Sequence, residues 1–221
     1  MLPSLDLSIP SDRGNHPGRR RLVLAAILAA LVVPCLILDT CALPFHELFV
    51  EKSRSQGWLK EVINPLRGMG GPAAPFLALT LMVILDPPRR RRVFFAILAF
   101  GAAVLAVQVT KALTGRARPE MAAGILSFKG PGIGGIFNDD YGSFPSGHTA
   151  SAFTLAAVLA INYPRSRWFF SILAAGCGFA RVAEGRHFPT DVYVGALIGI
   201  ASAGFFMALE TRTCRPPPTG S

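Results

Sequence analysis

Long apolar runs separated by short polar segments dominate the chain. The runs cover 22–38, 72–85, 93–113, 149–163, 168–182 and 192–209. As a helix, the run 93–113 reaches roughly 31 Å, which matches a hydrocarbon core of about 30 Å. Three runs (72–85, 149–163 and 168–182) are short for crossing alone, and we expect them to extend into flanking residues. The pattern predicts an all-α, polytopic membrane protein built as a bundle of six transmembrane helices.

The first run, 22–38, could also be a secretory signal peptide, because Arg19-Arg20-Arg21 precede it. However, it is long, contains Pro34 and leads into Asp39-Thr40-Cys41, which is no clear small-residue cleavage site. These features favour a first helix that stays in the mature protein.

Composition agrees with lipid as the solvent. Only 16% of the residues are charged and 51% are hydrophobic, whereas a soluble domain carries about a quarter charged residues. Cys35 and Cys177 lie within apolar runs, where a thiol usually packs as a small hydrophobic group. Since no CxxC or Cys/His pattern is present, the sequence predicts no metal and no cofactor.

The net charge of +9 is distributed unevenly. With six helices, one side of the membrane holds the N-terminal tail, the segment 89–92, the segment 165–167 and the C-terminal tail. Twelve of the 22 lysines and arginines fall there, and only four of the 13 acidic residues (Asp6, Asp12, Asp86 and Glu210) lie within or next to these segments. The positive-inside rule therefore predicts an inner-membrane protein with both termini in the cytoplasm. A basic face for nucleic acid is the competing explanation, and the six apolar runs argue against it.

The chain reads as one membrane domain, 1–221, with a disordered cytoplasmic tail over 1–18 and a second cytoplasmic tail over 211–221. The first outer loop, 39–71, contains Leu59, Val62, Ile63 and Leu66 at helical spacing. This spacing predicts an amphipathic helix lying at the membrane interface, with Trp58 at headgroup level. A short helix packed on the bundle explains the pattern equally well.

Three short motifs in the second half of the chain point to chemistry on a phosphoryl group. They are Lys111 with Arg118-Pro119, then Pro145-Ser146-Gly147-His148, then Arg181 with His187 and Asp191. Phosphoryl oxygens are bound by fixed cations and by N–H donors at a helix start. Two histidines, one of them followed by a carboxylate four residues later, can supply a nucleophile and an acid. The predicted topology brings all three motifs to the outer face of the membrane, where charged residues are usually functional.

In these motifs the sequence resembles the type-2 phosphatidate phosphatase superfamily, which also contains bacterial acid phosphatases, glucose-6-phosphatase and vanadium haloperoxidases. Many members have Ser before the arginine of the third motif, and here that position is Ala180. The resemblance implies that His187 attacks phosphorus and that Asp191 accepts the other imidazole N–H. It also implies that His148 is the acid and then the base. The implied phosphate ligands are Lys111, Arg118, Ser146, Gly147 and Arg181.

Each motif residue also has a purely structural explanation. Lys111 could extend its amine to the interface from a helix end, and Ser146 could be a helix cap. Arg181 and Asp191 could form an ion pair between helices. Outside the motifs, we expect Arg116 and Arg186 to meet anionic headgroups at the interface.

The sequence predicts a lipid phosphatase whose substrate keeps its acyl or prenyl chain in the bilayer. Phosphatidate, phosphatidylglycerophosphate, undecaprenyl diphosphate and a lipid A phosphate all remain candidates, with selection assigned to loops 39–71 and 114–147. A lipid phosphotransferase would use the same residues, and an inactive membrane scaffold would not need both histidines with Asp191. A haloperoxidase is disfavoured because those relatives are soluble. The sequence leaves the oligomeric state open.

Overall fold

A computed structural model describes residues 33, 37–41, 57–121, 123–132 and 139–213 of the chain. Its helices are α2 (Gly57–Gly68), α3 (Ala73–Leu85), α4 (Arg90–Thr114), α6 (Gly147–Asn162), α7 (Arg167–Ala183) and α8 (Pro189–Thr213). Over these described ranges the fold is all-α, with one isolated β-bridge between Arg116 and Phe128. Helices α3, α4, α6, α7 and α8 confirm five of the six predicted helical runs. The run 22–38 falls mostly outside the described residues, as do both predicted tails for most of their length.

Two helical segments are long and apolar enough to cross a membrane. They are Pro87–Thr114, of 28 residues, and Pro189–Thr213, of 25 residues. A third span arises if Lys60–Gly68 and Ala73–Leu85, which meet at a bend of 53°, count as one. Helices α6 and α7 have 16 and 17 residues. Helix α6 begins two residues before its apolar run, and α7 extends one residue beyond its run at each end. The protein is therefore a membrane protein, while the count of six spans stays a prediction.

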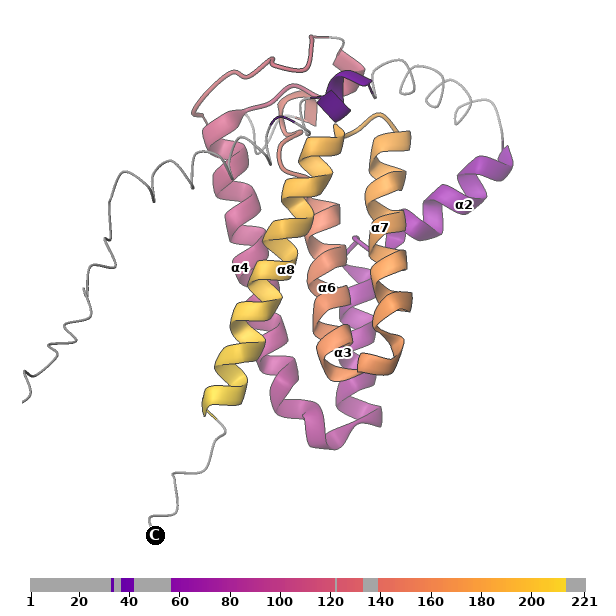
Figure 1. Cartoon of the computed structure of the whole chain (residues 1–221), viewed down its shortest axis with the longest axis vertical. Coiled ribbons are helices and arrows are strands. Elements are labelled where there is room, and N and C mark those ends of the chain that lie inside the picture. Colours follow the sequence, from indigo (N-terminus) through magenta and orange to yellow (C-terminus); the bar gives the residue numbers. More distant parts are fainter. Residues whose placement is uncertain (1–32, 34–36, 42–56, 122, 133–138, 214–221) are drawn as a thin grey trace, which may run out of the picture.

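Helix α6 lies at the centre of the bundle and contacts α3, α4, α7 and α8. Figure 1 shows it between α8 and α7, with α3 behind it. Small side chains such as Ala152 and Ala156 face α7, where they pack on Ala174 and Cys177. A second cluster lies towards the end of the bundle where α4 begins and α8 ends. It joins α3, α4, α6 and α8 through bulkier residues. It comprises Leu79, Met82, Val93, Phe95, Ala96, Val158, Ala203 and Met207.

A stripe of small residues on α8 lets this helix approach α6 closely. A Cβ atom at Gly195 would lie 2.5 Å from the Ser146 carbonyl oxygen, and one at Gly199 would lie 2.8 Å from the Thr154 nitrogen. Small residues four apart are a recurrent way of bringing membrane helices together. The close approach fixes the N-terminus of α6 against the N-terminus of α8, since Ser146 N–H donates to the Asp191 carbonyl at 2.9 Å.

Helix α2 lies beside α7 at an oblique angle and extends outward from the bundle, as Figure 1 shows. Its buried residue Ile63 packs on Ala180 and Ala183 of α7, and Leu66 packs beside it. The amphipathic pattern over 57–68 thus corresponds to a helix whose apolar face contacts α7, with Val62 half exposed. Of the two explanations that the sequence allowed, packing on the bundle is observed, and a place at the lipid interface stays a prediction.

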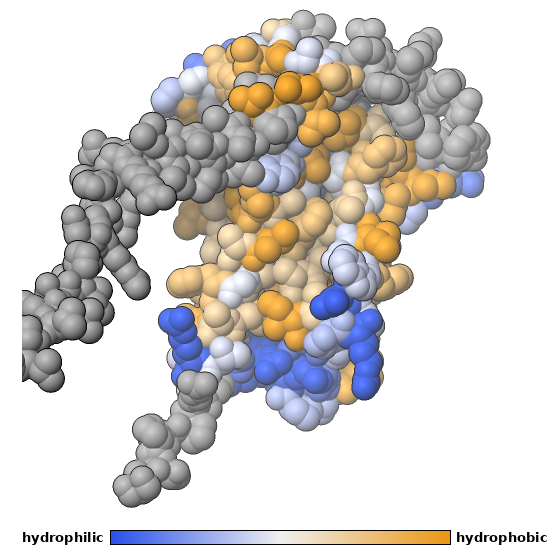
Figure 2. Space-filling model, in the orientation of Figure 1, coloured by the Kyte–Doolittle hydropathy of each residue, from blue (hydrophilic) through white to orange (hydrophobic). Residues whose placement is uncertain are grey.

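Arginines gather at one end of the bundle. This end holds the segment from Asp86 to Arg92, the turn Pro164–Ser166 and the end of α8. There, Arg92 donates to Asn162 at 3.0 Å and lies 3.4 Å from Glu210. Figure 2 shows hydrophilic residues gathered at this lower end and apolar surface over the middle of the bundle. The predicted site residues lie at the opposite end.

Candidate active site

The helix ends bring the three motifs together. Helix α4 ends, α6 begins, α7 ends and α8 begins at the same end of the bundle (Figure 1). Gly115 stops α4 in the left-handed conformation, at φ 54°, and its N–H donates to the Lys111 carbonyl at 3.0 Å. Gly185, at φ 75°, ends the turn after α7 and directs the chain back towards α8. Only glycine adopts such backbone angles without strain.

His187 lies in this short connection, and only 3% of its surface is exposed. Its Nδ1 atom is 2.7 Å from the carbonyl oxygen of Ser143 and 3.7 Å from Oδ2 of Asp191. A carbonyl oxygen can only accept, so Nδ1 carries the hydrogen and Nε2 keeps its lone pair. We expected Asp191 to accept this hydrogen. In the structure the Ser143 carbonyl accepts this hydrogen bond, and the Asp191 carboxylate lies next to it.

Burial lowers the pKa of His187 from its ordinary 6.5 to about 4, against the opposing effect of Asp191. The imidazole is therefore neutral at physiological pH. A neutral imidazole with a free Nε2 is the form that can attack an electrophile.

Asp191 is fully buried, and three donors hold its carboxylate. Arg116 Nη1 donates to Oδ1 at 2.6 Å. Ser143 Oγ donates to Oδ2 at 2.5 Å, and the Phe188 N–H donates to it at 2.8 Å. Because every contact favours the charged form, the carboxylate is a fixed negative charge beside the His187 ring.

The expectation that Arg116 meets lipid headgroups is wrong. Its side chain is 3% exposed and bridges Asp191 and Asp39, with Nη2 2.8 Å from the Asp39 carboxylate. Its guanidinium also stacks 4.1 Å from the centre of the Phe188 ring. Arg116 is held in the interior because two carboxylates and an aromatic face replace its hydration.

Asp39 is a residue that the sequence reasoning missed. It is fully buried, accepts from the Thr190 N–H at 2.9 Å and also contacts the Thr190 hydroxyl. Asp39 thus ties the end of the first apolar run to the start of α8, next to Asp191. The sequence did contain a sign of this role, since Asp39 is an acid at the end of an apolar run. Charged residues at the membrane edge usually have a partner or a function.

Arg181 and Arg118 are both buried at the same end of the bundle. Arg181 pairs with Glu184 through Nη1, while its Nε is a buried donor without a hydrogen-bond partner among the described residues. A buried donor of this kind calls for an explanation, and a ligand oxygen provides one. The Arg118 main chain donates to Asp140 at 2.9 Å, and its Nη1 lies 3.5 Å from the Arg186 carbonyl.

The structural explanation of Ser146 is confirmed, since it caps α6. Its Oγ accepts from the Thr149 N–H at 3.4 Å and from the Thr149 hydroxyl at 2.9 Å. Gly147 and His148 form the first turn of the helix. The N–H groups of a first turn point away from the helix and attract anions.

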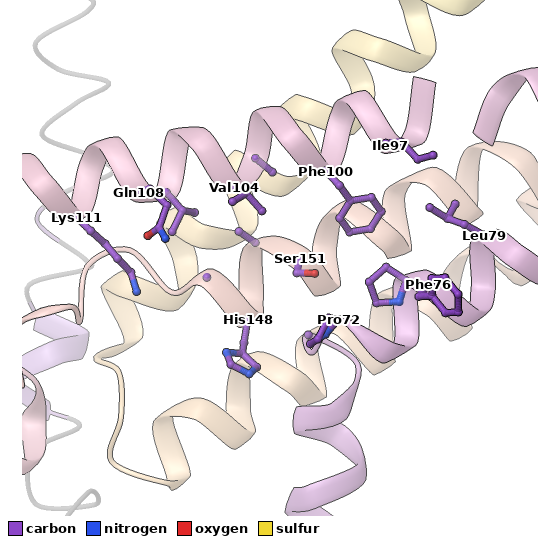
Figure 3. A pocket seen from close by; sticks show the side chains of 16 residues that line it. Pro72, Phe76, Leu79, Ile97, Phe100, Val104, Gln108, Lys111, His148 and Ser151 are labelled. Carbon is purple, nitrogen blue, oxygen red and sulfur yellow. The ribbon is translucent and has the colours of Figure 1, made fainter. Parts of the chain in front are cut away.

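Two cavities meet at His148. One, of about 460 Å³, is an apolar groove between α3, α4 and α6. Figure 3 shows Lys111 and His148 at one end of it, with Phe76, Leu79 and Phe100 towards the other. The second cavity, of about 590 Å³, is polar and is lined by Arg67, Arg181, Glu184 and Arg186. Pro72 and His148 line both cavities.

The arrangement can perform nucleophilic chemistry on an anionic group. It combines a neutral imidazole oriented by a carbonyl, a second histidine, buried guanidinium groups and a helix N-terminus. Within the described part of the chain, no group of three or more His, Cys, Asp or Glu side chains is arranged to hold a metal ion. The cationic side chains at this end of the bundle are those of Lys111 and the arginines.

Comparison with known proteins identifies the family. The PAP2 superfamily matches residues 76–213, which contain all three motifs. This chain belongs to the PAP2 superfamily.

Curated relatives include the bacitracin transport permease protein BcrC of Bacillus licheniformis, 29% identical over 59% of this chain and 63% of that protein. The lipid A 1-phosphatase of Rhizobium johnstonii is 35% identical over 48% of this chain and 41% of that protein. Undecaprenyl-diphosphatase BcrC of Bacillus subtilis is 31% identical over 34% of this chain and 38% of that protein. The chain thus spans less than two thirds of the length of each of these three relatives.

Two solved structures share the fold. The crystal structure of Aquifex aeolicus LpxE matches 73% of this chain and 93% of that chain, with a TM-score of 0.57 and 30% identity. A PAP2-type phosphatidylglycerolphosphate phosphatase from Bacillus subtilis matches 85% of this chain and 97% of that chain, with a TM-score of 0.58 and 23% identity. The second likeness concerns the fold alone.

Proposed function

We propose that this protein is an integral-membrane lipid phosphatase that removes a phosphate from a lipid phosphate or diphosphate. The observation that carries the proposal is the meeting of an apolar groove and a polar, arginine-lined cavity at His148. A lipid phosphate has one apolar chain and one anionic end, so it fits this pair of cavities. PAP2 membership supports the same reaction class, and two relatives are named as a lipid A 1-phosphatase and an undecaprenyl-diphosphatase.

In the proposed first step, His187 Nε2 attacks phosphorus and the bond to the leaving oxygen breaks. His148, protonated in the complex because the anionic substrate offsets the positive charges around it, gives its proton to that oxygen. The Ser143 carbonyl keeps the hydrogen on Nδ1, and the nearby Asp191 carboxylate stabilises the positive charge that develops on the ring. The product of this step is a phosphohistidine at position 187.

In the second step, water attacks the phosphohistidine while His148 takes a proton from the water. Inorganic phosphate then leaves. Lys111, Arg118 and Arg181 stabilise the charge on the transferring oxygens, together with Ser146 and the Gly147 N–H. The Arg181 Nε, which has no hydrogen-bond partner among the described residues, is a donor that a phosphoryl oxygen would satisfy. Since side chains supply the cations, we propose that the reaction needs no metal ion.

The chain of the substrate would lie in the groove between α3 and α4. Phe76 and Ile97 line it and are more than half exposed, so the groove opens towards the surface that faces lipid. We place the site on the extracytoplasmic face of the inner membrane, because the arginine-rich end lies opposite.

A lipid phosphotransferase is the nearest alternative, since it would use the same phosphohistidine with a second lipid in place of water. An inactive scaffold is disfavoured because His148, His187 and Asp191 are all present.

Phosphate release by purified protein tests the proposal. We expect release from at least one member of a panel of lipid phosphates, with and without EDTA, and inhibition by vanadate, which mimics the transition state. His187→Ala is the control and should be inactive. No release from any lipid, or a loss on chelation that magnesium restores, would contradict the proposal, and transfer to a second lipid would favour the phosphotransferase.

A further inference from the structure

We propose that the polar cavity is a subsite for a second phosphate on the leaving-group side of the substrate, and that Arg67 recognises it. The inference rests on the phosphatase function proposed above and narrows the substrate class to lipid diphosphates.

The polar cavity is lined by more arginines than the three motifs supply. Three arginines line it (Arg67, Arg181 and Arg186), with Glu184 as the one acid in its lining. Arg181 belongs to the third motif and would bind the transferring phosphoryl group. Arg186 lies outside the motifs and pairs with Glu120 at 2.6 Å. Arg67 also lies outside the motifs, so its charge can meet a further anion.

Arg67 is held at the cavity by the packing of α2 on α7. A Cβ atom at Gly176 would lie 2.8 Å from the Leu66 side chain, so the glycine lets Leu66 seat directly against α7. The Cys177 thiol, also on α7, contacts the Arg67 carbonyl at 3.7 Å. These contacts fix the last turn of α2, and the Arg67 side chain lines the same cavity as His148.

The present partner of Arg67 is one that a ligand can replace. Its Nη1 lies 3.4 Å from Oε1 of Glu184, and about half of its side chain is exposed. Exposed ion pairs of this kind contribute little to stability. Glu184 also pairs with Arg181, so one carboxylate is shared between a motif arginine and Arg67. A phosphate group would take over the contact to Arg67 at small cost.

His148 determines which part of the substrate reaches Arg67. As the proposed acid, it protonates the leaving oxygen, and it lies at the boundary of the groove and the polar cavity. In a lipid diphosphate the leaving oxygen bridges the two phosphorus atoms, so the phosphate that stays on the lipid lies at this boundary. Its chain can then enter the groove while its oxygens face Arg67. In a lipid monophosphate the leaving oxygen belongs to the chain itself, so there is no second phosphate for Arg67 to contact.

The reaction balances with water as the sole co-reactant. His187 Nε2 forms a bond to the terminal phosphorus as the bond to the bridging oxygen breaks, and the His148 proton goes to that oxygen. Water then hydrolyses the phosphohistidine. The products are the lipid monophosphate and inorganic phosphate.

Farnesyl diphosphate and farnesyl monophosphate, which share one chain, provide the test. We would measure kcat/KM for both with wild-type protein, Arg67→Gln, Arg67→Lys and Lys60→Gln. Lys60 is the matched control, because it is exposed on the same helix and lies seven residues, or about 10 Å, before Arg67. Arg67→Gln should lower kcat/KM for the diphosphate about 10–100-fold, the range for a hydrogen bond to a charged group. The value for the monophosphate should change less than about threefold, Arg67→Lys should recover part of the loss, and Lys60→Gln should resemble wild type.

Three results would overturn the inference alone: equal loss on both substrates, no loss on the diphosphate, or the same loss in Lys60→Gln. Weaker inhibition by inorganic phosphate in Arg67→Gln, with unchanged selectivity, would assign the cavity to the released product and also overturn it. Wild-type protein that releases phosphate from neither substrate, nor from any lipid of the panel above, would overturn the proposed function and this inference with it.

Discussion

At the scale of single residues, Arg116 connects the surroundings of His187 to the end of the first apolar run. Its guanidinium lies 2.6 Å from the Asp191 carboxylate and 2.8 Å from that of Asp39, and all three side chains are buried. Removing one member of a buried ion group leaves an uncompensated charge in the interior. The middle member matters most here, because its loss leaves two acids facing each other.

Arg116→Ala should therefore destabilise the protein by about 3–5 kcal/mol, measured by denaturant unfolding in detergent. Arg91→Ala removes the same charge at an exposed position, where the side chain contacts Thr213 at 3.4 Å, and should cost less than about 0.5 kcal/mol. Asp39→Asn in the Arg116→Ala background should recover part of the loss by removing one of the two charges. Equal stability of the two arginine variants would contradict this account of the network.

The sequence could not predict this network, although it predicted the motif residues beside it. The three motifs lie within 81 consecutive residues and each is recognisable by its own spacing. Arg116 and Asp39 are 77 positions apart, and no local pattern links them. In the same way, the Ser143 carbonyl is a main-chain group, so the residue type gave no sign that it would orient His187.

At the scale of helices, the contact of α6 with α8 sets the geometry of the site. The N-terminus of α6 carries Ser146, Gly147 and His148, and that of α8 carries Asp191. The glycine stripe on α8 brings the two ends together, so side-chain volume at Gly195 should control their separation.

Gly195→Ala should destabilise the protein by about 1–3 kcal/mol, because its Cβ would lie 2.5 Å from the Ser146 carbonyl and the two helices would have to separate. The measurement is thermal unfolding in detergent. Gly204→Ala is the matched control on the same helix: a Cβ there meets nothing within 4 Å, and alanine is favoured over glycine in a helix by about 1 kcal/mol. A melting temperature of Gly195→Ala at or above that of wild type would show that the close approach is not needed.

Helix positions were predictable from the apolar runs, whereas helix contacts were not. The runs located α3, α4, α6, α7 and α8 to within a few residues. Hydrophobicity does not reveal which face of α2 meets α7, because lipid and a protein neighbour both favour apolar side chains. The contact depends on Gly176, whose missing side chain makes room for Leu66.

At the scale of the whole molecule, the two ends of the bundle differ in charge and in chemistry. Arginine-rich segments lie at one end, and the candidate site lies at the other. The positive-inside rule then orients the site away from the cytoplasm. A lipid phosphate in the outer leaflet would reach the site through the groove without leaving the bilayer.

Cysteine labelling tests this orientation. In a variant with the four native cysteines replaced by serine, a cysteine at Ser127 should react with an impermeant thiol reagent in intact cells. A cysteine at Arg90, exposed at the arginine-rich end, should react only after permeabilisation. The reverse pattern would contradict the proposed topology.

The central claim is that His187 carries the phosphoryl group and His148 moves the protons. Rapid quench with a labelled phosphate ester that has a good leaving group tests it most directly, because an activated ester does not need an acid for the first step. Acid-labile, base-stable phosphohistidine is measured at early times in wild type, His187→Ala and His148→Ala.

The account predicts no phosphoenzyme in His187→Ala. It predicts that phosphoenzyme accumulates in His148→Ala, because hydrolysis slows by about 10²–10⁴-fold when the base that activates water is lost. Phosphoenzyme in His187→Ala, or none in His148→Ala with the activated ester, would contradict the assignment of the two histidines.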